Sequence, residues 1–333
     1  MTKIGIIGLG FMGGTHAAAY QQLKSVLDFK VTAVADINRE KADKTADLLG
    51  AKAYYSAQEL IDQADINTAD VCLPTFLHNE YASKAVAKGF NVFVEKPVCL
   101  NSKDAYSLAK QAEEKGVFSQ VGQCIRFWTE YEYLKSVIDS ETYGKVKHIK
   151  LRRLSPRPTW GWNNWLLDAE LSGGAALDLQ IHDADFALYL FGKPEKITAF
   201  ATHGGEKYSG IVSGLKYKDF TVMTEGSWDY TSSFPFEMSY IAEFEQATVI
   251  FSSVHGLKVC PEGGTIFTPE LNKECVAQSD TGGNISDLGG YYNELYYFID
   301  CINKGIRPTK ASLLAGAESV ELAEKQKLAS EKD

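Results

Sequence analysis

The chain has 333 residues, more than one hydrophobic core usually organises, so two domains are expected. Hydrophobic residues make up 45% and charged residues 23% of the sequence, which excludes a disordered or collagen-like protein. Its 43 acidic residues outnumber the 34 basic ones, and the resulting charge of -9 disfavours nucleic acid and anionic membranes as partners.

The six cysteines form no CxxC pair and no short Cys/His cluster, which is typical of apolar filling in a reducing compartment rather than of disulfides or zinc sites. The apolar opening from Ile4 to Leu9 is too short for a signal-peptide core or a membrane span. We therefore expect a cytoplasmic protein.

From residue 3 to about 120, short apolar runs alternate with helical stretches such as 39–49 and 79–88. This alternation predicts a parallel sheet with helices on both faces and right-handed crossovers. A first domain is therefore expected over residues 1–122. The expected strands are 3–8, 30–36, 70–73, 91–95 and 117–122.

A glycine-rich turn follows the first expected strand directly. Gly8 suits a tight turn, Gly10 lets the backbone approach a pyrophosphate, and Gly13 allows close contact between helix and strand. The helix start at Phe11 and Met12 would then present free N–H groups to the phosphates. The pattern predicts a dinucleotide site.

Asp36 ends the second expected strand, where a carboxylate can accept hydrogen bonds from ribose hydroxyls. It would repel a 2'-phosphate by about 4 kcal/mol per unit charge at about 4 Å, so NAD is favoured over NADP. Arg39 leaves NADP possible. The alternative is that Asp36 is an ordinary turn residue at the strand end.

Lys96 lies at the carboxyl end of another expected strand, between Glu95 and Pro97. Ligands of open α/β sheets bind at this edge, and burial can bring a lysine pKa toward neutrality. Lys96 is therefore a candidate acid, base or donor to substrate, with a surface lysine as the alternative. Pro97 could permit a cis peptide.

After about residue 145, strands follow one another, and apolar residues fall on every second position of 236–244. This pattern predicts an antiparallel sheet with one covered face. A second domain is expected over residues 123–333, with helices at 168–191, at 290–302 and from 312 onward. Its expected strands are 148–154, 196–202, 210–217, 221–228, 236–244 and 247–253.

Asp178 and His182 are four residues apart in the first of these helices, so we expect them on one helical face. A carboxylate beside an imidazole orients it and raises its pKa, as a general base requires. The alternatives are a structural pair or, last, a metal site with Asp185, and no metal is predicted.

Four motifs occur in the same order along the chain: the glycine turn, Pro74-Thr75-x-x-His78, Glu95-Lys96-Pro97, and Gly173-Gly174 leading to Asp178-x-x-x-His182-Asp183. With these motifs in this order, the sequence resembles members of the glucose-fructose oxidoreductase / inositol dehydrogenase (Gfo/Idh/MocA) family. The resemblance implies an α/β Rossmann domain followed by an α+β domain with an open-faced, mainly antiparallel sheet. It also implies a pyridine nucleotide cofactor and a homodimer or homotetramer formed through that sheet.

The resemblance further implies Lys96, Asp178 and His182 as catalytic residues. His182 would take a hydroxyl proton, Asp178 would steer His182, and Lys96 would hydrogen-bond the reacting oxygen. Pro74, Thr75 and His78 would shape the nicotinamide side of the groove, and Glu95 would support Lys96 there. Thr75 replaces a frequent Asn and Gln180 a common Gly, so the pocket could differ from that of the family.

Two further candidates concern the substrate. Arg126 would contact substrate or a carboxylate, with a surface charge as the equal alternative. Trp162 and Asn163 belong to a tryptophan-rich segment, and an indole face and an amide suit a sugar ring and its hydroxyls. The same indoles would serve equally well in packing between domains.

The predicted function is an NAD(P)-dependent oxidoreductase that transfers hydride between nicotinamide and a sugar or cyclic polyol. One alternative is a dihydrodiol or biliverdin-type reductase with an apolar substrate. The other is a non-catalytic regulator that senses nucleotide, against which the intact residues Lys96, Asp178 and His182 argue.

Overall fold

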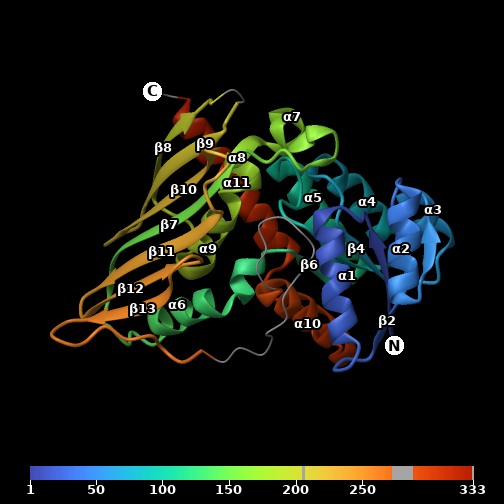
Figure 1. Cartoon of the computed structure of the whole chain (residues 1–333), viewed down its shortest axis with the longest axis horizontal. Coiled ribbons are helices and arrows are strands. Elements are labelled where there is room, and N and C mark those ends of the chain that lie inside the picture. Colours follow the sequence, from blue (N-terminus) through green and yellow to red (C-terminus); the bar gives the residue numbers. More distant parts are fainter. Residues whose placement is uncertain (205–206, 272–287, 332–333) are drawn as a thin grey trace. The chain divides into compact units, whose positions relative to one another are not determined.

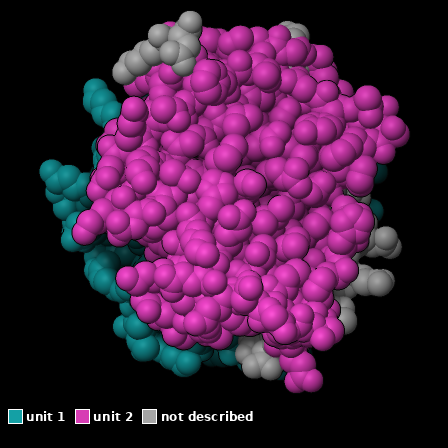
Figure 2. Space-filling model, turned by 90° about the vertical axis from the view of Figure 1, so that its left-hand side faces the viewer, with its two compact units in different colours: residues 1–127, 275–320 teal, residues 128–274, 321–333 magenta. Residues whose placement is uncertain are grey.

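The computed structural model describes residues 1–204, 207–271 and 288–331. The chain forms two compact units (Figures 1 and 2). Unit 1 comprises residues 1–127 and the described part of 275–320, and unit 2 comprises residues 128–274 and 321–333 as far as they are described. Within the described residues, no helix combines the length and the apolar character that crossing a bilayer requires.

Unit 1 contains a parallel sheet with the strand order β3-β2-β1-β4-β5-β6. Every pairing between these neighbours is parallel, as predicted for an α/β Rossmann domain. Because β2, β1, β4 and β5 are adjacent and parallel, their carboxyl ends lie at the same edge of the sheet. The strands are β1 Thr2–Ile7, β2 Phe29–Ala35, β3 Lys52–Tyr54, β4 Thr68–Val71, β5 Asn91–Val94 and β6 Ser119–Val121.

Helices cover both faces of this sheet. Ile4 and Ile6 point into a core shared with helices α1 and α10, whereas a Cβ on Gly5 would lie 2.9 Å from Leu60 of α3 on the other face. β1 is therefore buried on both faces, which explains its continuous apolar run. The helices are α1 Phe11–Leu23, α2 Arg39–Leu49, α3 Ala57–Gln63, α4 Thr75–Ala87, α5 Ser102–Lys115 and α10 Gly289–Lys304, with a 3-10 turn η1 at Cys124–Phe127.

Helix α10 joins unit 1 although it lies far along the sequence. Its residues Leu295, Phe298 and Ile299 are fully buried in the same core as Tyr20 of α1. The predicted division into residues 1–122 and 123–333 placed this helix in the second domain. The compact units differ from that division because the α10 side chains complete the core of the parallel sheet.

Unit 2 contains a seven-stranded sheet with the order β13-β12-β11-β7-β10-β9-β8. All pairings are antiparallel except that of β7 with β10, which confirms the mainly antiparallel sheet. The strands are β7 Val146–Pro156, β8 Lys196–Thr202, β9 Gly210–Lys216, β10 Thr221–Tyr230, β11 Glu237–Phe244, β12 Ala247–Ser252 and β13 Gly256–Pro261.

One face of this sheet is covered by other parts of unit 2, and the other face is exposed. Along β10, Val222 and Thr224 are fully buried, while Met223 between them is 40% exposed. Gln180 packs against the buried face, because its amide donates to the Thr224 hydroxyl at 2.6 Å. Figure 2 looks onto the opposite, open face of unit 2.

The helix predicted at 168–191 is instead three short helices. Gly173, with φ of +79°, ends the first, and a turn at Leu179 and Gln180 separates the other two. The helices of unit 2 are α6 Thr129–Asp139, α7 Ala169–Ser172, α8 Gly174–Asp178 and α9 Ile181–Phe191, with a 3-10 segment η2 at Trp162–Leu167. Helix α11 Leu313–Ser330 begins in unit 1 and ends in unit 2.

Candidate active site

The loop between β1 and α1 is built around three glycines. A Cβ on Gly13 would lie 1.9 Å from the Gly8 carbonyl oxygen, and a Cβ on Gly8 would lie 2.7 Å from the Cys72 carbonyl oxygen. Gly8 also has φ of +91°, a conformation that favours glycine. At Gly10, by contrast, no described atom lies within 4 Å of such a Cβ, so a ligand can approach the backbone there.

Helix α1 starts at this opening without a side-chain cap. Its N-cap is Gly10, no side chain accepts from its first N–H groups, and its first turn has no acidic residue. The free N–H groups and the positive end of the helix dipole suit an anion. Phe11 and Met12 are half-buried at the helix start, and Met12 packs on the core of unit 1. The loop therefore fits the pyrophosphate of a dinucleotide.

Asp36 follows β2 and faces the glycine loop. One of its carboxylate oxygens accepts a hydrogen bond from Leu9 N at 2.8 Å, and the other accepts from Asn38 N at 2.7 Å. The guanidinium of Arg39 lies 4.0 Å from the centre of the Tyr55 ring, a cation–π contact at the surface. These contacts hold the Asp36 carboxylate against the glycine loop and leave the Arg39 cation at the surface three residues further along.

Lys96 lies two residues after the end of β5, at the edge of the sheet that also carries the glycine loop. Its side chain is partly buried, and the peptide bond to Pro97 is cis. The His78 ring lies between two carbonyl oxygens, with Nδ1 2.8 Å from Pro97 O and Nε2 2.6 Å from Leu73 O. Burial lowers the pKa of His78. His78 thus braces the chain just after Lys96.

Glu95 turns its carboxylate into unit 1. Oε2 accepts a hydrogen bond from Lys96 N at 3.1 Å, and Oε1 lies 2.9 Å from His16 Nε2. A Cβ on Gly122 would lie 2.8 Å from Oε1, so glycine is needed beside this carboxylate. These contacts support the predicted role of Glu95 beneath Lys96. His16 itself was not singled out from the sequence.

Asp178 and His182 lie in unit 2. The expectation of one continuous helix through both is wrong, because α8 ends at Asp178 and α9 begins at Ile181. The break follows from the bond that Gln180 N donates to Ala175 O at 2.8 Å, one residue longer than an α-helical bond. His182 is 6% exposed, and Asp178 is partly buried.

Asp183 follows His182 and is fully buried beside Arg153 of β7. Arg153 is 4% exposed, and one of its terminal nitrogens lies 3.6 Å from Asp183 Oδ1. Burial raises the pKa of Asp183 to about 6, against the opposing effect of the Arg153 charge. This pair ties the start of α9 to the sheet of unit 2.

The raised pKa of Asp183 predicts a pH-dependent stability. The buried carboxyl favours the folded state while it is protonated. This stabilisation of the fold is fully present below the unfolded pKa near 3.8 and is lost as pH rises through the folded pKa of about 6. Wild type should therefore lose about 3 kcal/mol of unfolding free energy over this window, a loss that Asp183→Asn should not share. Urea unfolding of both proteins from pH 4 to 8 measures the difference. Parallel stability curves would show that Asp183 does not change its protonation on folding.

The remaining predicted residues occupy varied surroundings. Arg126 is 4% exposed and donates to Lys310 O at 2.7 Å, so the surface alternative is wrong. Trp162 is 55% exposed, and Asn163 next to it has φ of +49°. Pro74 is the N-cap of α4, and Thr75, the first residue of that helix, is buried. Lys96 lies in unit 1 and the Asp178–His182 pair in unit 2, so their joint action is a proposal.

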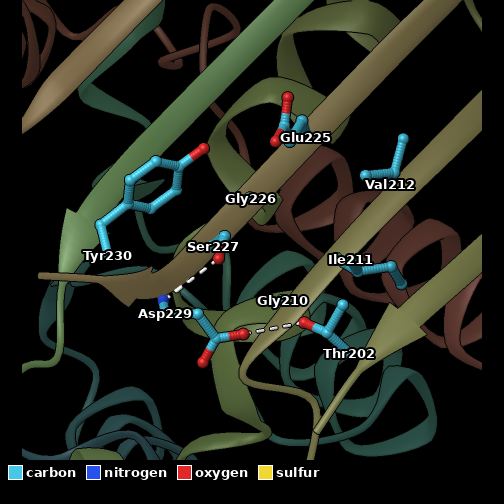
Figure 3. A pocket seen from close by; sticks show the side chains of 9 residues that line it. All are labelled: Thr202, Gly210, Ile211, Val212, Glu225, Gly226, Ser227, Asp229 and Tyr230. Atoms are coloured by element: carbon cyan, nitrogen blue, oxygen red, sulfur yellow. Dashed lines mark hydrogen bonds between the residues drawn. The ribbon is translucent and has the colours of Figure 1, made fainter. Parts of the chain in front are cut away.

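The open face of unit 2 also carries a hollow of about 280 Å³ (Figure 3). Asp229 accepts a hydrogen bond from Thr202 at 2.9 Å and one from Ser209 at 2.9 Å. None of the residues predicted for the active site lines this hollow. It is lined by Thr202, Gly210, Ile211, Val212, Glu225, Gly226, Ser227, Asp229 and Tyr230.

Two family models match the chain. A model described as an oxidoreductase family with an NAD-binding Rossmann fold matches residues 2–123, and a GFO/IDH/MocA C-terminal domain model matches residues 131–248. Together these matches cover well over half of the sequence.

Relatives and solved structures agree with these models. The scyllo-inositol 2-dehydrogenase (NAD(+)) of Bacillus subtilis is 26% identical over 92% of this chain and 87% of its own. The myo-inositol 2-dehydrogenase of Thermotoga maritima is 31% identical over 57% of this chain and 55% of its own, about half its length. A levoglucosan dehydrogenase solved with NADH and levoglucosan superposes with a TM-score of 0.85 over 99% of this chain and 97% of its own, at 18% identity, which shows the shared fold.

Proposed function

Because the chain belongs to the GFO/IDH/MocA family of NAD-binding oxidoreductases, we propose that it transfers hydride between NAD and a hydroxyl carbon of a sugar or cyclic polyol. The inositol dehydrogenases among its relatives support this substrate class over the apolar diol and the silent regulator. NAD is the preferred nucleotide in this proposal, in which the Asp36 carboxylate accepts from the ribose hydroxyls.

The observation that carries the proposal is the convergence of residues at one edge of unit 1. Asp36, the glycine loop, Pro74 and Lys96 follow the adjacent parallel strands β2, β1, β4 and β5 in that order. The carboxyl edge of an open parallel sheet is where ligands of such folds bind. The glycine loop would hold the pyrophosphate, and Asp36 would accept from the ribose hydroxyls. Lys96 would reach the nicotinamide ring.

Bound NAD supplies the acceptor for the hydride. In the proposed mechanism His182 takes the hydroxyl proton of the substrate, and Asp178 orients His182 for that transfer. Lys96 donates a hydrogen bond to the reacting oxygen and stabilises the charge that grows there. In the reverse direction the same groups return the proton. Trp162, Asn163 and Arg126 are proposed to line the substrate side.

The open face of the unit 2 sheet is proposed to join copies of the chain into a homodimer or homotetramer. Three large apolar side chains are exposed on this face, one each from β8, β10 and β12: Phe200 at 65%, Met223 at 40% and Ile250 at 36%. Exposed apolar side chains gathered on one face are typical of an association surface. Light scattering of the full chain would give its mass in solution, and a monomer would contradict this part of the proposal.

The cytoplasm is the proposed location. The cysteines Cys72, Cys99, Cys124, Cys260 and Cys301 are free, and most are buried, as expected of a protein made for a reducing compartment.

A substrate panel tests the proposed function. The full chain is incubated with inositols, aldoses, sugar acids and aromatic diols, each with NAD and with NADP, and absorbance is followed at 340 nm. We expect turnover with at least one sugar or polyol and a preference for NAD. Turnover with diols alone, or none with any compound, would contradict the proposal.

A further inference from the structure

His16 of α1 is fully buried between acidic side chains from two strands. Its Nδ1 donates to Asp70 Oδ2 of β4 at 2.9 Å, and its Nε2 lies 2.9 Å from Glu95 Oε1, just after β5. Glu294 of α10 is also fully buried, and one ligand atom from each of His16, Glu95 and Glu294 lies within 4.8 Å of the others. Acidic residues from three distant parts of the chain thus converge on one imidazole.

The charge balance favours an imidazolium. A neutral ring would set a lone pair near one of the two carboxylates, whereas the imidazolium carries an N–H on each nitrogen. The Nε2–Glu95 contact is at ion-pair distance without hydrogen-bond geometry, so its attraction is that of opposite charges. Burial lowers the pKa of His16, but the charges and hydrogen bonds of Asp70 and Cys72 together hold it well above its usual value. Burial and the Glu95 charge raise the pKa of Glu294.

Two further groups face Asp70 in this cluster. Tyr20, one turn further along α1 than His16, donates its hydroxyl to Asp70 Oδ2 at 2.8 Å. The thiol of Cys72 lies 3.3 Å from Asp70 Oδ1, and burial raises its pKa. Asp70 is therefore held from several sides, while His16 is the cation that faces Glu95.

Glu95 connects this cluster to Lys96. Its second carboxylate oxygen accepts from Lys96 N, and the carboxylate fills the space beside Gly122 that a Cβ would need. On the far side of Lys96, the His78 ring lies 2.8 Å from the Pro97 carbonyl oxygen and 2.6 Å from the Leu73 carbonyl oxygen. Side chains thus contact the main chain on both sides of Lys96.

We propose that His16 is a positioning residue for Lys96: by holding the Glu95 carboxylate, it fixes the main chain from which the Lys96 side chain extends. This inference rests on the proposed function, since it assumes that Lys96 acts on the substrate. A loosened Glu95 would displace the ammonium group from the reacting oxygen, and displacements of about 1 Å can lower turnover about a hundredfold.

Three variants of the full chain separate positioning from simple support of the fold. The side-chain amide of His16→Gln reaches as far as Nε2 and can still donate to Glu95. That of His16→Asn reaches only as far as Nδ1 and can still donate to Asp70. Tyr20→Phe removes a donor to Asp70 without touching Glu95, and is the matched control.

With NAD and the best panel substrate, His16→Asn should lower kcat by about 10- to 100-fold, whereas His16→Gln and Tyr20→Phe should stay within about threefold of wild type. Lower Tm values are expected for all three, with an unchanged Kd for NADH by fluorescence. Equal loss of kcat in His16→Asn and His16→Gln, or no loss in His16→Asn, would overturn the inference.

A double variant, with His16→Asn added to Lys96→Met, tests whether His16 acts through Lys96. If His16 acts through Lys96, adding His16→Asn to Lys96→Met should give no further loss of kcat, and a further tenfold loss would overturn the inference. Should Lys96→Met alone leave turnover unchanged, the proposed function fails and the inference fails with it. Should Lys96→Met abolish turnover while His16→Asn does not reduce it, the inference alone fails.

A readout without turnover completes the test. In protein labelled with 15N-histidine, both His16 nitrogens should carry protons at pH 8 in wild type and in Tyr20→Phe. A neutral His16 ring would overturn the inference. One equivalent of divalent metal in the purified protein, lost in Glu294→Gln, would also overturn it, since the same atoms would then hold a cation instead.

Discussion

Replacing Lys96 by methionine is expected to lower kcat about a thousandfold, within the range of about 10²- to 10⁴-fold that positioned acid–base groups contribute. Methionine keeps the length of the side chain but cannot donate to the reacting oxygen. The glycine loop and Asp36 lie at other positions along the sheet edge, so the Kd for NADH should stay within about threefold of wild type. Stopped-flow absorbance and nicotinamide fluorescence measure the two quantities.

Lys103→Met is the control for this prediction. Lys103 is an exposed lysine near the start of α5, seven residues further along the chain. It should leave both kcat and nucleotide binding unchanged. Full turnover in Lys96→Met would remove the ammonium group from the mechanism, and loss of nucleotide binding would assign it to the cofactor instead.

Changing Asp36 to serine is expected to raise the ratio of kcat/KM for NADP to that for NAD by about a hundredfold. The carboxylate would repel a 2'-phosphate by about 4 kcal/mol per unit charge at a separation of about 4 Å, and part of that effect survives solvent screening. Serine removes the charge, and the exposed Arg39 guanidinium three residues later can then attract the phosphate.

Asp43→Ser is the matched control for the change of preference. Asp43 is an acid of the same unit that accepts from the Tyr55 hydroxyl at 3.0 Å rather than from the glycine loop. Initial rates with both nucleotides should give the wild-type ratio. An unchanged ratio in Asp36→Ser would show that Asp36 does not face the ribose, and its bond to Leu9 N would then be its main role.

The parallel sheet could be predicted because its central strands are buried on both faces and form nearly continuous apolar runs. The edge strand β3 at Lys52–Tyr54 was missed, because it has only three residues and begins with the exposed Lys52. The helix at 168–191 was predicted as continuous because its apolar spacing is helical throughout. Its breaks depend on the left-handed conformation of Gly173 and on packing at Gln180.

The place of α10 could not be read from its sequence. Its apolar face is that of any amphipathic helix, and only the three-dimensional fit of Phe298 against Phe93, with ring centres 5.6 Å apart, brings it to the parallel sheet. An amphipathic pattern shows that a face is buried but not against which partner.

The cluster around His16 was missed for a related reason. Its members lie at positions 16, 70, 95 and 294, and no motif spacing links them. One signal was present: His16 lies in an Ala-rich helix and Asp70 in an apolar strand, and polar side chains at such positions are buried only with a partner. Lys96, by contrast, could be predicted because its place at a strand end follows from local sequence.

Transfer of deuterium tests the central claim most directly. The full chain is incubated with NAD and the best panel substrate carrying deuterium on the carbon of the reacting hydroxyl, and the reduced nucleotide is analysed by mass spectrometry. We expect one deuterium in the nicotinamide ring and a slower rate than with the unlabelled substrate. Reduced nucleotide without deuterium, or no reduction with any sugar or polyol, would contradict hydride transfer from such a substrate.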